Sequence, residues 1–132
     1  PIFVGGGVAH GPKGAVYKIK KINKKVRKLA LAHTLSKKNS DKNLFVLTDV
    51  KKEIKKTKEF NNFLKKNNLL NVIIISDVET LKNINKSARN IKDLKIINDA
   101  GANIYDMMKY KNVLLTQSSV KNLEKRILNE KN

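Results

Sequence analysis

Residues 72–77 read Val72-Ile73-Ile74-Ile75-Ser76-Asp77, a continuous apolar run that ends in two polar residues. Comparable apolar runs occupy residues 44–48, 94–97 and 113–116. A strand with one exposed face alternates apolar and polar side chains, whereas a strand buried on both faces reads as a continuous apolar run. The four runs therefore predict a parallel β-sheet that is covered by helices on both faces.

Segments with helical spacing of apolar residues separate these runs. They comprise residues 57–66, residues 78–89, a short helix that Asn103 can cap, and a last helix after Thr116. Strands and helices thus alternate, which predicts an α/β fold: a three-layer α/β/α sandwich around a four-stranded parallel sheet. Periodicity does not fix the order of the strands. The residues expected to face the core from these helices are Phe60, Phe63, Leu64, Leu81, Ile84, Ala88, Val120, Leu123, Ile127 and Leu128.

A further helix is predicted before the first strand, from Asn23 as its N-cap to about Lys37. We expect its apolar face to pack on the core and its basic side chains to point outward. The apolar face is formed by Ile22, Val26, Leu29, Ala30 and His33, with Leu31 and Leu35 beside it.

Positive charge is concentrated at the beginning of the chain. The 132 residues include 29 Lys+Arg and 11 Asp+Glu, for a net charge of +18. Residues 1–40 hold ten of the basic residues and no acidic residue. Biased codon usage can favour Lys over Arg, but it does not account for the missing acids. Such a one-sided charge requires a polyanion nearby, and RNA is the polyanion that it predicts.

Glycines mark the first segment as different from the rest. Gly5, Gly6, Gly7, Gly11 and Gly14, together with Pro12, disfavour a helix there. We therefore predict two parts: an extended basic strap over residues 1–21 and an α/β globular domain over residues 22–132.

Several classes of function are disfavoured. There is no cysteine, so disulfides and thiolate sites are excluded. Neither His10 nor His33 lies among carboxylates in the sequence, so no metal is predicted, and Gly5-x-Gly7-x-x-x-Gly11 lacks the strand and helix that a dinucleotide loop needs. We predict no cofactor. His33 is expected to be a packed or partly exposed side chain.

The lengths of the apolar segments and the absence of a signal sequence bear on where the protein is located. The longest apolar run is far below the ~20 residues of a membrane helix, so no membrane partner is predicted. No secretory signal is present, which favours the cytoplasm or an organelle matrix. The sequence begins at Pro1 rather than at a methionine, which suggests a fragment or a processed chain.

Six blocks of residues, in order along nearly the whole chain, resemble the bacterial type of the large-subunit ribosomal protein four family. The first two blocks are the most specific. The blocks are Gly5-Gly6-Gly7-x-x-x-Gly11-Pro12-Lys13, Lys24-Lys25-Val26-Arg27-Lys28-Leu29-Ala30-Leu31-x-x-x-Leu35-Ser36, Lys56-Thr57-Lys58-Glu59-Phe60, Ala88-Arg89-Asn90, Asn103-Ile104-Tyr105-Asp106 and Leu115-Thr116.

The resemblance implies a structural constituent of the large ribosomal subunit without catalytic activity. Its implied partners are large-subunit rRNA, neighbouring ribosomal proteins and, in some members, the leader mRNA of their own operon. It also implies an extended loop whose tip lies near the peptide exit tunnel. We expect that tip to lie upstream of Pro1. Gly14-Ala15 stands where the family usually has Pro-Arg, so Lys13 or Lys18 would replace the arginine as a point charge.

Candidate RNA contacts come from the basic strap, the first helix and the start of the next helix. Tyr17 can stack on a base, and the backbone amides at a helix start add to the positive field of the lysines there. The predicted RNA-binding residues are His10, Lys13, Tyr17, Lys18, Lys20, Lys21, Lys24, Lys25, Arg27, Lys28, Lys56, Lys58 and Arg89.

Two other functions are compatible with parts of the sequence. Asp49, Asp77 and Asp99 follow predicted strands, where α/β enzymes that act on phosphorylated or nucleic-acid substrates place catalytic groups. Aspartates are also common in strand-to-helix turns, because their carboxylates accept backbone hydrogen bonds. The remaining alternative is a basic RNA chaperone that binds all RNA equally.

Overall fold

A parallel sheet forms the centre of the molecule. The structure, a computed structural model, describes residues 3–8, 10–12, 20–48 and 56–128. Ile74 in the interior of the sheet is paired with Ile96 on one side and with Leu114 on the other. The predicted parallel sheet is confirmed, and the order of its strands is β1-β4-β2-β3. The strands are β1 (Leu44–Leu47), β2 (Val72–Ser76), β3 (Leu94–Asn98) and β4 (Asn112–Thr116).

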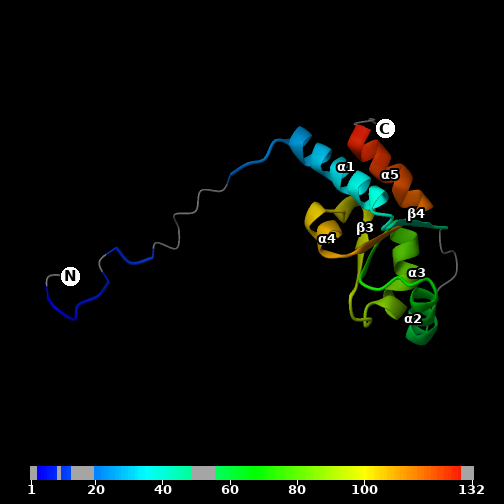
Figure 1. Ribbon diagram of the computed structural model, residues 1–132, viewed down its shortest axis with the longest axis horizontal. Helices are drawn as coiled ribbons and strands as arrows, with labels where there is room; N and C mark the ends of the chain where they lie inside the picture. The colour runs from blue at the N-terminus through cyan, green and yellow to red at the C-terminus, as the bar shows by residue number, and fades with distance from the viewer. Residues whose placement is uncertain (1–2, 9, 13–19, 49–55, 129–132) are drawn as a thin grey trace.

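Helices cover both faces of this sheet, so the predicted three-layer sandwich is also confirmed (Figure 1). One face is covered by α2 (Thr57–Lys66) and α3 (Val78–Ala88). The opposite face is covered by α1 (Lys24–Ser40), α4 (Ile104–Lys109) and α5 (Gln117–Leu128). A short 3₁₀ turn, η1 (Asp99–Gly101), connects β3 to α4.

The interior of β2 belongs to two separate cores. Ile73 and Ile75 pack with residues of α1, α4 and α5, whereas Val72 and Ile74 pack with residues of α2 and α3. The three isoleucines have no exposed surface. Burying such a side chain contributes about 1.5–3 kcal/mol, so the four apolar residues at 72–75 all favour the same three-layer arrangement.

The edge strands differ from the prediction of strands buried on both faces. Phe45 and Val46 of β1 are 38% and 60% exposed, and all five residues of β3 are only half-buried. Each edge strand has a neighbouring strand on one side only, and the helices cover the sheet most completely over β2 and β4. An apolar run alone does not distinguish a central strand from an edge strand.

Helix α1 packs through a different face from the predicted one. Asn23 caps it as expected, and its side chain accepts a hydrogen bond from the Lys25 amide at 3.2 Å. The helix ends at Ser40 rather than near Lys37. Its buried residues are Leu31, Thr34 and Lys38, while Ile22, Val26, Leu29 and His33 are exposed.

The polar members of this buried face have partners that explain their position. The Lys38 ammonium donates to the carbonyls of Tyr110 and Lys111 at 2.7 and 3.0 Å. The Thr34 hydroxyl donates to the Ala30 carbonyl at 2.8 Å. These bonds offset the cost of burying polar groups, so the less apolar face can lie against the sheet.

The remaining helices follow the prediction more closely. Phe60, Leu64, Ile84, Ala88 and Leu123 are buried, as expected. Phe63 and Leu128 are 38% and 67% exposed, and these two positions were predicted wrongly because each lies at the border of its helix's apolar face. Phe63 instead stacks on Phe60, with 6.3 Å between ring centroids.

The strap can be compared with its prediction only in part. Residues 3–8, 10–12 and 20–23 form no helix or strand, and the Gly6 amide donates to the Phe3 carbonyl at 3.1 Å. Residues 13–19 lie outside the described residues, so the division at residue 21 stays a prediction. No helix in the described part of the chain is long and apolar enough to cross a membrane.

Central and edge positions of the sheet should contribute unequally to stability. We expect Ile74→Ala to lower the free energy of unfolding by about 2–5 kcal/mol, because it leaves a cavity between β2, α2 and α3. Val46→Ala, at the exposed edge, should change it by about 0.5 kcal/mol or less. Urea unfolding followed by circular dichroism measures both values. Equal losses in the two variants would contradict the central role of β2.

Candidate nucleic-acid interface

The first turns of α1 carry basic residues on the same side as the buried Leu31. Lys24, Arg27 and Lys28 precede Leu31 by seven, four and three positions, which is the spacing of neighbours on one helix face. Lys24 and Arg27 are exposed, and Lys28 is half-buried. The basic side of α1 is therefore a continuation of its packed side, and not the opposite side of the helix.

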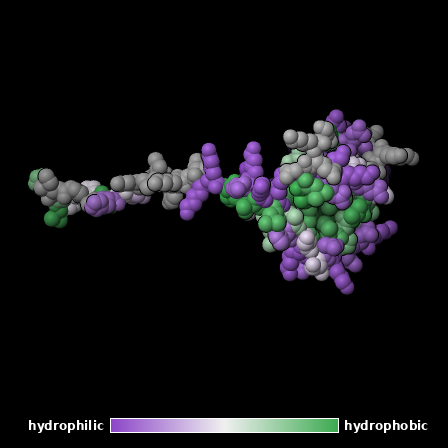
Figure 2. Space-filling model, turned by 90° about the horizontal axis from the view of Figure 1, so that it is seen from above, coloured by the Kyte–Doolittle hydropathy of each residue, from purple (hydrophilic) through white to green (hydrophobic). Residues whose placement is uncertain are grey.

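A pocket of about 410 Å³ lies where this basic side meets the segment before α4 and the last turn of α5. Its floor is apolar, with Leu31 and Ala102 only 5% and 3% exposed. Eight of the described residues line it, of which four are basic and none is acidic. Figure 2 looks down on the α1 and α5 side of the domain and shows apolar surface bordered by hydrophilic side chains. The pocket is lined by Lys24, Arg27, Lys28, Leu31, Ala102, Asn103, Ile104 and Arg126.

Arg126 joins the last turn of α5 to the segment that forms one wall of the pocket. Its Nη1 donates to the carbonyls of Asp99, Ala100 and Ala102 at 3.1, 3.2 and 3.3 Å. These carbonyls belong to the η1 turn and to Ala102, which follows it. Arg126 was not predicted as a site residue. The only feature of the sequence that could have indicated it is that a basic residue stands in the last turn of a helix. A basic residue at that position is already explained by its favourable interaction with the helix dipole.

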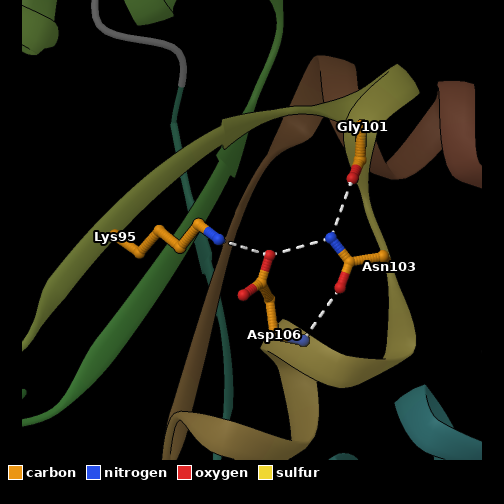
Figure 3. A network of polar contacts seen from close by, with 4 residues as sticks. All are labelled: Lys95, Gly101, Asn103 and Asp106. Carbon is orange, nitrogen blue, oxygen red and sulfur yellow. Dashed lines mark hydrogen bonds and ion pairs between the residues drawn. The ribbon is translucent and has the colours of Figure 1, made fainter. Parts of the chain in front are cut away.

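A second network fixes the same wall from the other side (Figure 3). The Asn103 side chain accepts from the Asp106 amide at 2.8 Å and donates to the Asp106 carboxylate at 2.8 Å. The same carboxylate accepts from Lys95 of β3 at 2.6 Å. The Asn103 amide also donates to the Gly101 carbonyl at 3.3 Å. The predicted cap at Asn103 is confirmed, and it is tied to the sheet through Lys95.

The ionisation of Asp106 reflects these bonds. Asp106 is 5% exposed, and burial alone would favour its neutral form. The hydrogen bond from Lys95, followed by that from Asn103, outweighs burial and lowers the pKa of Asp106 below its usual value. Asp106 is thus a charged structural group beneath the pocket wall.

Lys38 is a basic residue of α1 that has a structural role. It is 9% exposed, and its ammonium is held by the two carbonyls before β4. Burial lowers the pKa of Lys38, and the nearby Asp41 opposes this shift. This lysine anchors the end of α1, whereas the exposed Lys24, Lys25 and Arg27 remain accessible to a ligand.

The other predicted RNA contacts do not all lie on this surface. Lys20, Lys21 and His10 are exposed, and His10 has a left-handed backbone with φ of 60°. Lys13, Tyr17 and Lys18 lie outside the described residues. The three predicted contacts on α2 and α3 lie over the opposite face of the sheet, and they are Lys56, Lys58 and Arg89.

That second basic surface is less concentrated than the first. Lys56 pairs with Glu59 at 3.6 Å, which offsets part of its charge. Lys58 lines a second pocket, of about 470 Å³, together with Lys92, which was not predicted. Arg89 is exposed at the end of α3. The structure therefore groups Lys24, Arg27 and Lys28 with Arg126, and separates them from Lys56, Lys58 and Arg89.

The strand-end aspartates have structural partners. The Asp77 carboxylate accepts from the Thr80 amide at 3.5 Å and caps α3. The Asp99 carboxylate accepts from the Ala100 amide and from the Asn122 side chain. Asp49 lies outside the described residues. Among the described residues, no three His, Cys, Asp or Glu side chains lie close enough together to hold a metal ion.

Comparison with known proteins places these residues in a family context. The sequence matches the model of the ribosomal protein L4/L1 family over residues 1–126. It is 46% identical over 127 residues to a protein of Pelagibacter ubique named large ribosomal subunit protein uL4, covering 96% of this chain and 61% of that protein.

Proteins with the same name give similar matches in two other bacteria. The protein of Rickettsia akari is 40% identical over 123 residues, which cover 93% of this chain and 59% of that protein. The protein of Hyphomonas neptunium is 36% identical over 126 residues, which cover 96% of this chain and 58% of that protein. The chain thus spans about three fifths of the length of these curated relatives.

The network in Figure 3 makes a prediction about stability in acid. Asp106→Asn should lower the free energy of unfolding at pH 7 by about 1–3 kcal/mol, since it removes a buried charged acceptor. The folded-state pKa of Asp106 is lowered, so its contribution is present above the unfolded pKa and is lost as pH falls through the folded pKa. The difference between the two proteins should therefore shrink below about pH 4.

Urea unfolding between pH 7 and pH 3 measures this difference. Glu124→Gln, at an exposed position of α5, is the control for removing one carboxylate. A difference between Asp106→Asn and the original protein that stays constant over the whole range would contradict the assignment.

Proposed function

Because the chain belongs to the ribosomal protein L4/L1 family, we propose that it is a structural constituent of the large ribosomal subunit that binds large-subunit rRNA through the basic side of α1. The observation that supports this proposal most is the grouping of Lys24, Arg27, Lys28 and Arg126 around one pocket, with no acid among the described residues that line it. The family is one of ribosomal proteins rather than enzymes, in agreement with the prediction that the chain has no catalytic activity.

The proposed mechanism is the neutralisation of RNA phosphates. Lys20, Lys21, Lys24, Lys25 and Arg27 are all exposed, and they follow one another from the strap into α1. Each phosphate that they neutralise releases condensed counterions, which drives association and makes it sensitive to salt. Arg27 adds a planar guanidinium, which can contact a phosphate or a base in ways that a lysine cannot.

We assign different roles to the two predicted parts of the chain. Residues 1–21 would follow an irregular RNA surface, at an entropic cost that counterion release offsets. Residues 22–132 would supply the folded platform. Neighbouring ribosomal proteins, the leader mRNA of its own operon, and a position on the ribosome near the peptide exit tunnel belong to the same proposal.

Salt dependence provides a direct test of the phosphate contacts. Replacing Lys24, Lys25 and Arg27 by Ala should weaken binding to an rRNA fragment and make the slope of log K against log salt shallower by about 2–3. The control replaces Lys65, Lys66 and Lys82, which are exposed on α2 and α3 over the opposite face of the sheet, and removes the same charge. Fluorescence anisotropy over a series of salt concentrations measures the affinity and the salt slope of each triple variant. Equal slopes for the two triple variants would overturn the assignment of the contact surface.

Competition distinguishes the ribosomal role from that of a basic RNA chaperone. We expect a complex with a fragment from the 5′ region of large-subunit rRNA to survive excess tRNA at moderate salt, because specific contacts add to the shared phosphate contacts. Filter binding with labelled rRNA measures the surviving fraction. Complete displacement by tRNA would favour the chaperone, which binds all RNA equally.

A further inference from the structure

We propose that the pocket between α1, the start of α4 and α5 holds one unpaired nucleotide of the bound RNA, with its base against the apolar floor and its phosphate at the basic rim. This inference rests on the proposed function, and it adds the class of ligand and the way that the ligand is held. It also assigns a binding role to Ile104 and Arg126, which the sequence did not indicate.

The composition of the pocket requires a ligand with two different parts. A surface that binds only phosphates needs basic side chains and no hollow, because the backbone of a duplex lies on the outside. Here the basic residues instead surround a floor made by Leu31, Ala102 and the half-buried Ile104. A ligand that matches this pocket has an apolar group in contact with the floor and a negative charge near the basic side chains at the rim. A nucleotide has both, in its base and its phosphate.

The size of the pocket limits the ligand to a small unit. Its volume of about 410 Å³ is at the lower end of the ~300–1,000 Å³ of small-molecule sites, so it can hold one nucleotide but no helical segment. Bases of A-form RNA are stacked and paired inside the duplex, and sequence-specific proteins therefore contact bases that are splayed out of single-stranded loops and bulges. The geometry thus selects an unpaired nucleotide.

The wall opposite α1 is held in place before any ligand arrives. Arg126 fixes the carbonyls of residues 99, 100 and 102 from one side. Asn103 and Asp106 fix the beginning of α4 from the other side, and Lys95 ties them to β3. A pocket that is already formed loses little conformational entropy on binding.

The guanidinium groups supply the contacts that a planar base needs. The three hydrogen bonds that Arg126 makes within the described part of the chain all use Nη1. Arg27 is exposed at the rim, on the α1 side of the pocket. Guanidinium planes stack on bases and also pair with phosphates.

Methyl NMR tests the proposal on the folded chain, with adenosine 5′-monophosphate as the probe. We expect ring-current shifts of the methyl resonances of Leu31, Ala102 and Ile104, because the base lies on the floor. Ribose 5-phosphate, which has the same charge but no base, should shift them much less. The exposed Leu70 and the buried Ile84 serve as methyl controls. Unmoved floor methyls, or equal shifts with ribose 5-phosphate, would overturn the proposal.

A charge-preserving variant tests the same site with RNA. Arg27→Lys keeps the positive charge, removes the planar guanidinium and changes an exposed position, so the fold should be retained. We expect the ratio of affinities for an unpaired 12-nucleotide RNA and a 12-base-pair RNA duplex to fall about tenfold, the order of magnitude of one stacked base. The control is Lys82→Arg, which exchanges lysine and arginine at an exposed position of α3, away from the pocket. An unchanged ratio would overturn the proposal.

The outcomes also separate this inference from the function on which it rests. If RNA binds with a steep salt slope but duplex and unpaired RNA bind alike, the surface binds phosphates and the nucleotide site is wrong. If neither RNA binds, the proposed function itself fails. Competition for the floor methyls by an acidic peptide, without any effect of adenosine 5′-monophosphate, would assign the pocket to a protein partner and overturn the proposal.

Discussion

Burial of β2 from both sides is the constraint on which the rest of the structure depends. Its residues alternate between two cores, so helices must cover both faces of the sheet at the same time. Layers of helix on a mostly parallel sheet are the arrangement that satisfies this requirement. The position of α1 follows from it, because Leu31 reaches the core that contains Ile73 and Ile75. The basic pocket exists because α1 is seated there, with its first turns beside α4 and α5.

Several acids in the described part of the domain have partners within local structure. The Asp77 carboxylate accepts a backbone hydrogen bond at the beginning of α3, and the Asp99 carboxylate accepts one in the η1 turn. The Asp106 carboxylate accepts from the side chains of Lys95 and Asn103. Asp41 and Glu59 pair with Lys37 and Lys56 elsewhere on the molecule. Acids that are used in this way stabilise local structure. Asp99 and Asp106 belong to the segment that forms the pocket wall, but no acid is among the described residues that line the pocket. The described lining of the pocket is therefore basic, with Lys24, Arg27, Lys28 and Arg126.

The comparison of α1 with its prediction shows how an apolar pattern can mislead. Ile22, Val26 and Leu29 form a more apolar stripe than the one that packs on the sheet, which is Leu31, Thr34 and Lys38. Yet Ile22, Val26 and Leu29 are 61%, 53% and 59% exposed. The packed stripe contains Thr34 and Lys38, which are polar but find backbone acceptors. Periodicity measures how apolar a face is, whereas packing also depends on where the acceptors for buried polar groups lie. For the same reason, Lys38 could not be separated from the ligand-accessible lysines by sequence alone.

The sequence by itself determined the secondary structure, the three layers and the α1 part of the candidate site. Continuous apolar runs, helical spacing and the caps at Asn23 and Asn103 are local properties, so the neighbouring residues are sufficient to predict them. Lys24, Arg27 and Lys28 were found because they lie close together in the chain. Only the tertiary structure decided the strand order, the face of α1 that is buried and the meeting of these residues with Arg126 and Ile104. Those features depend on contacts between residues that are far apart in sequence, and a local pattern contains no information about such contacts.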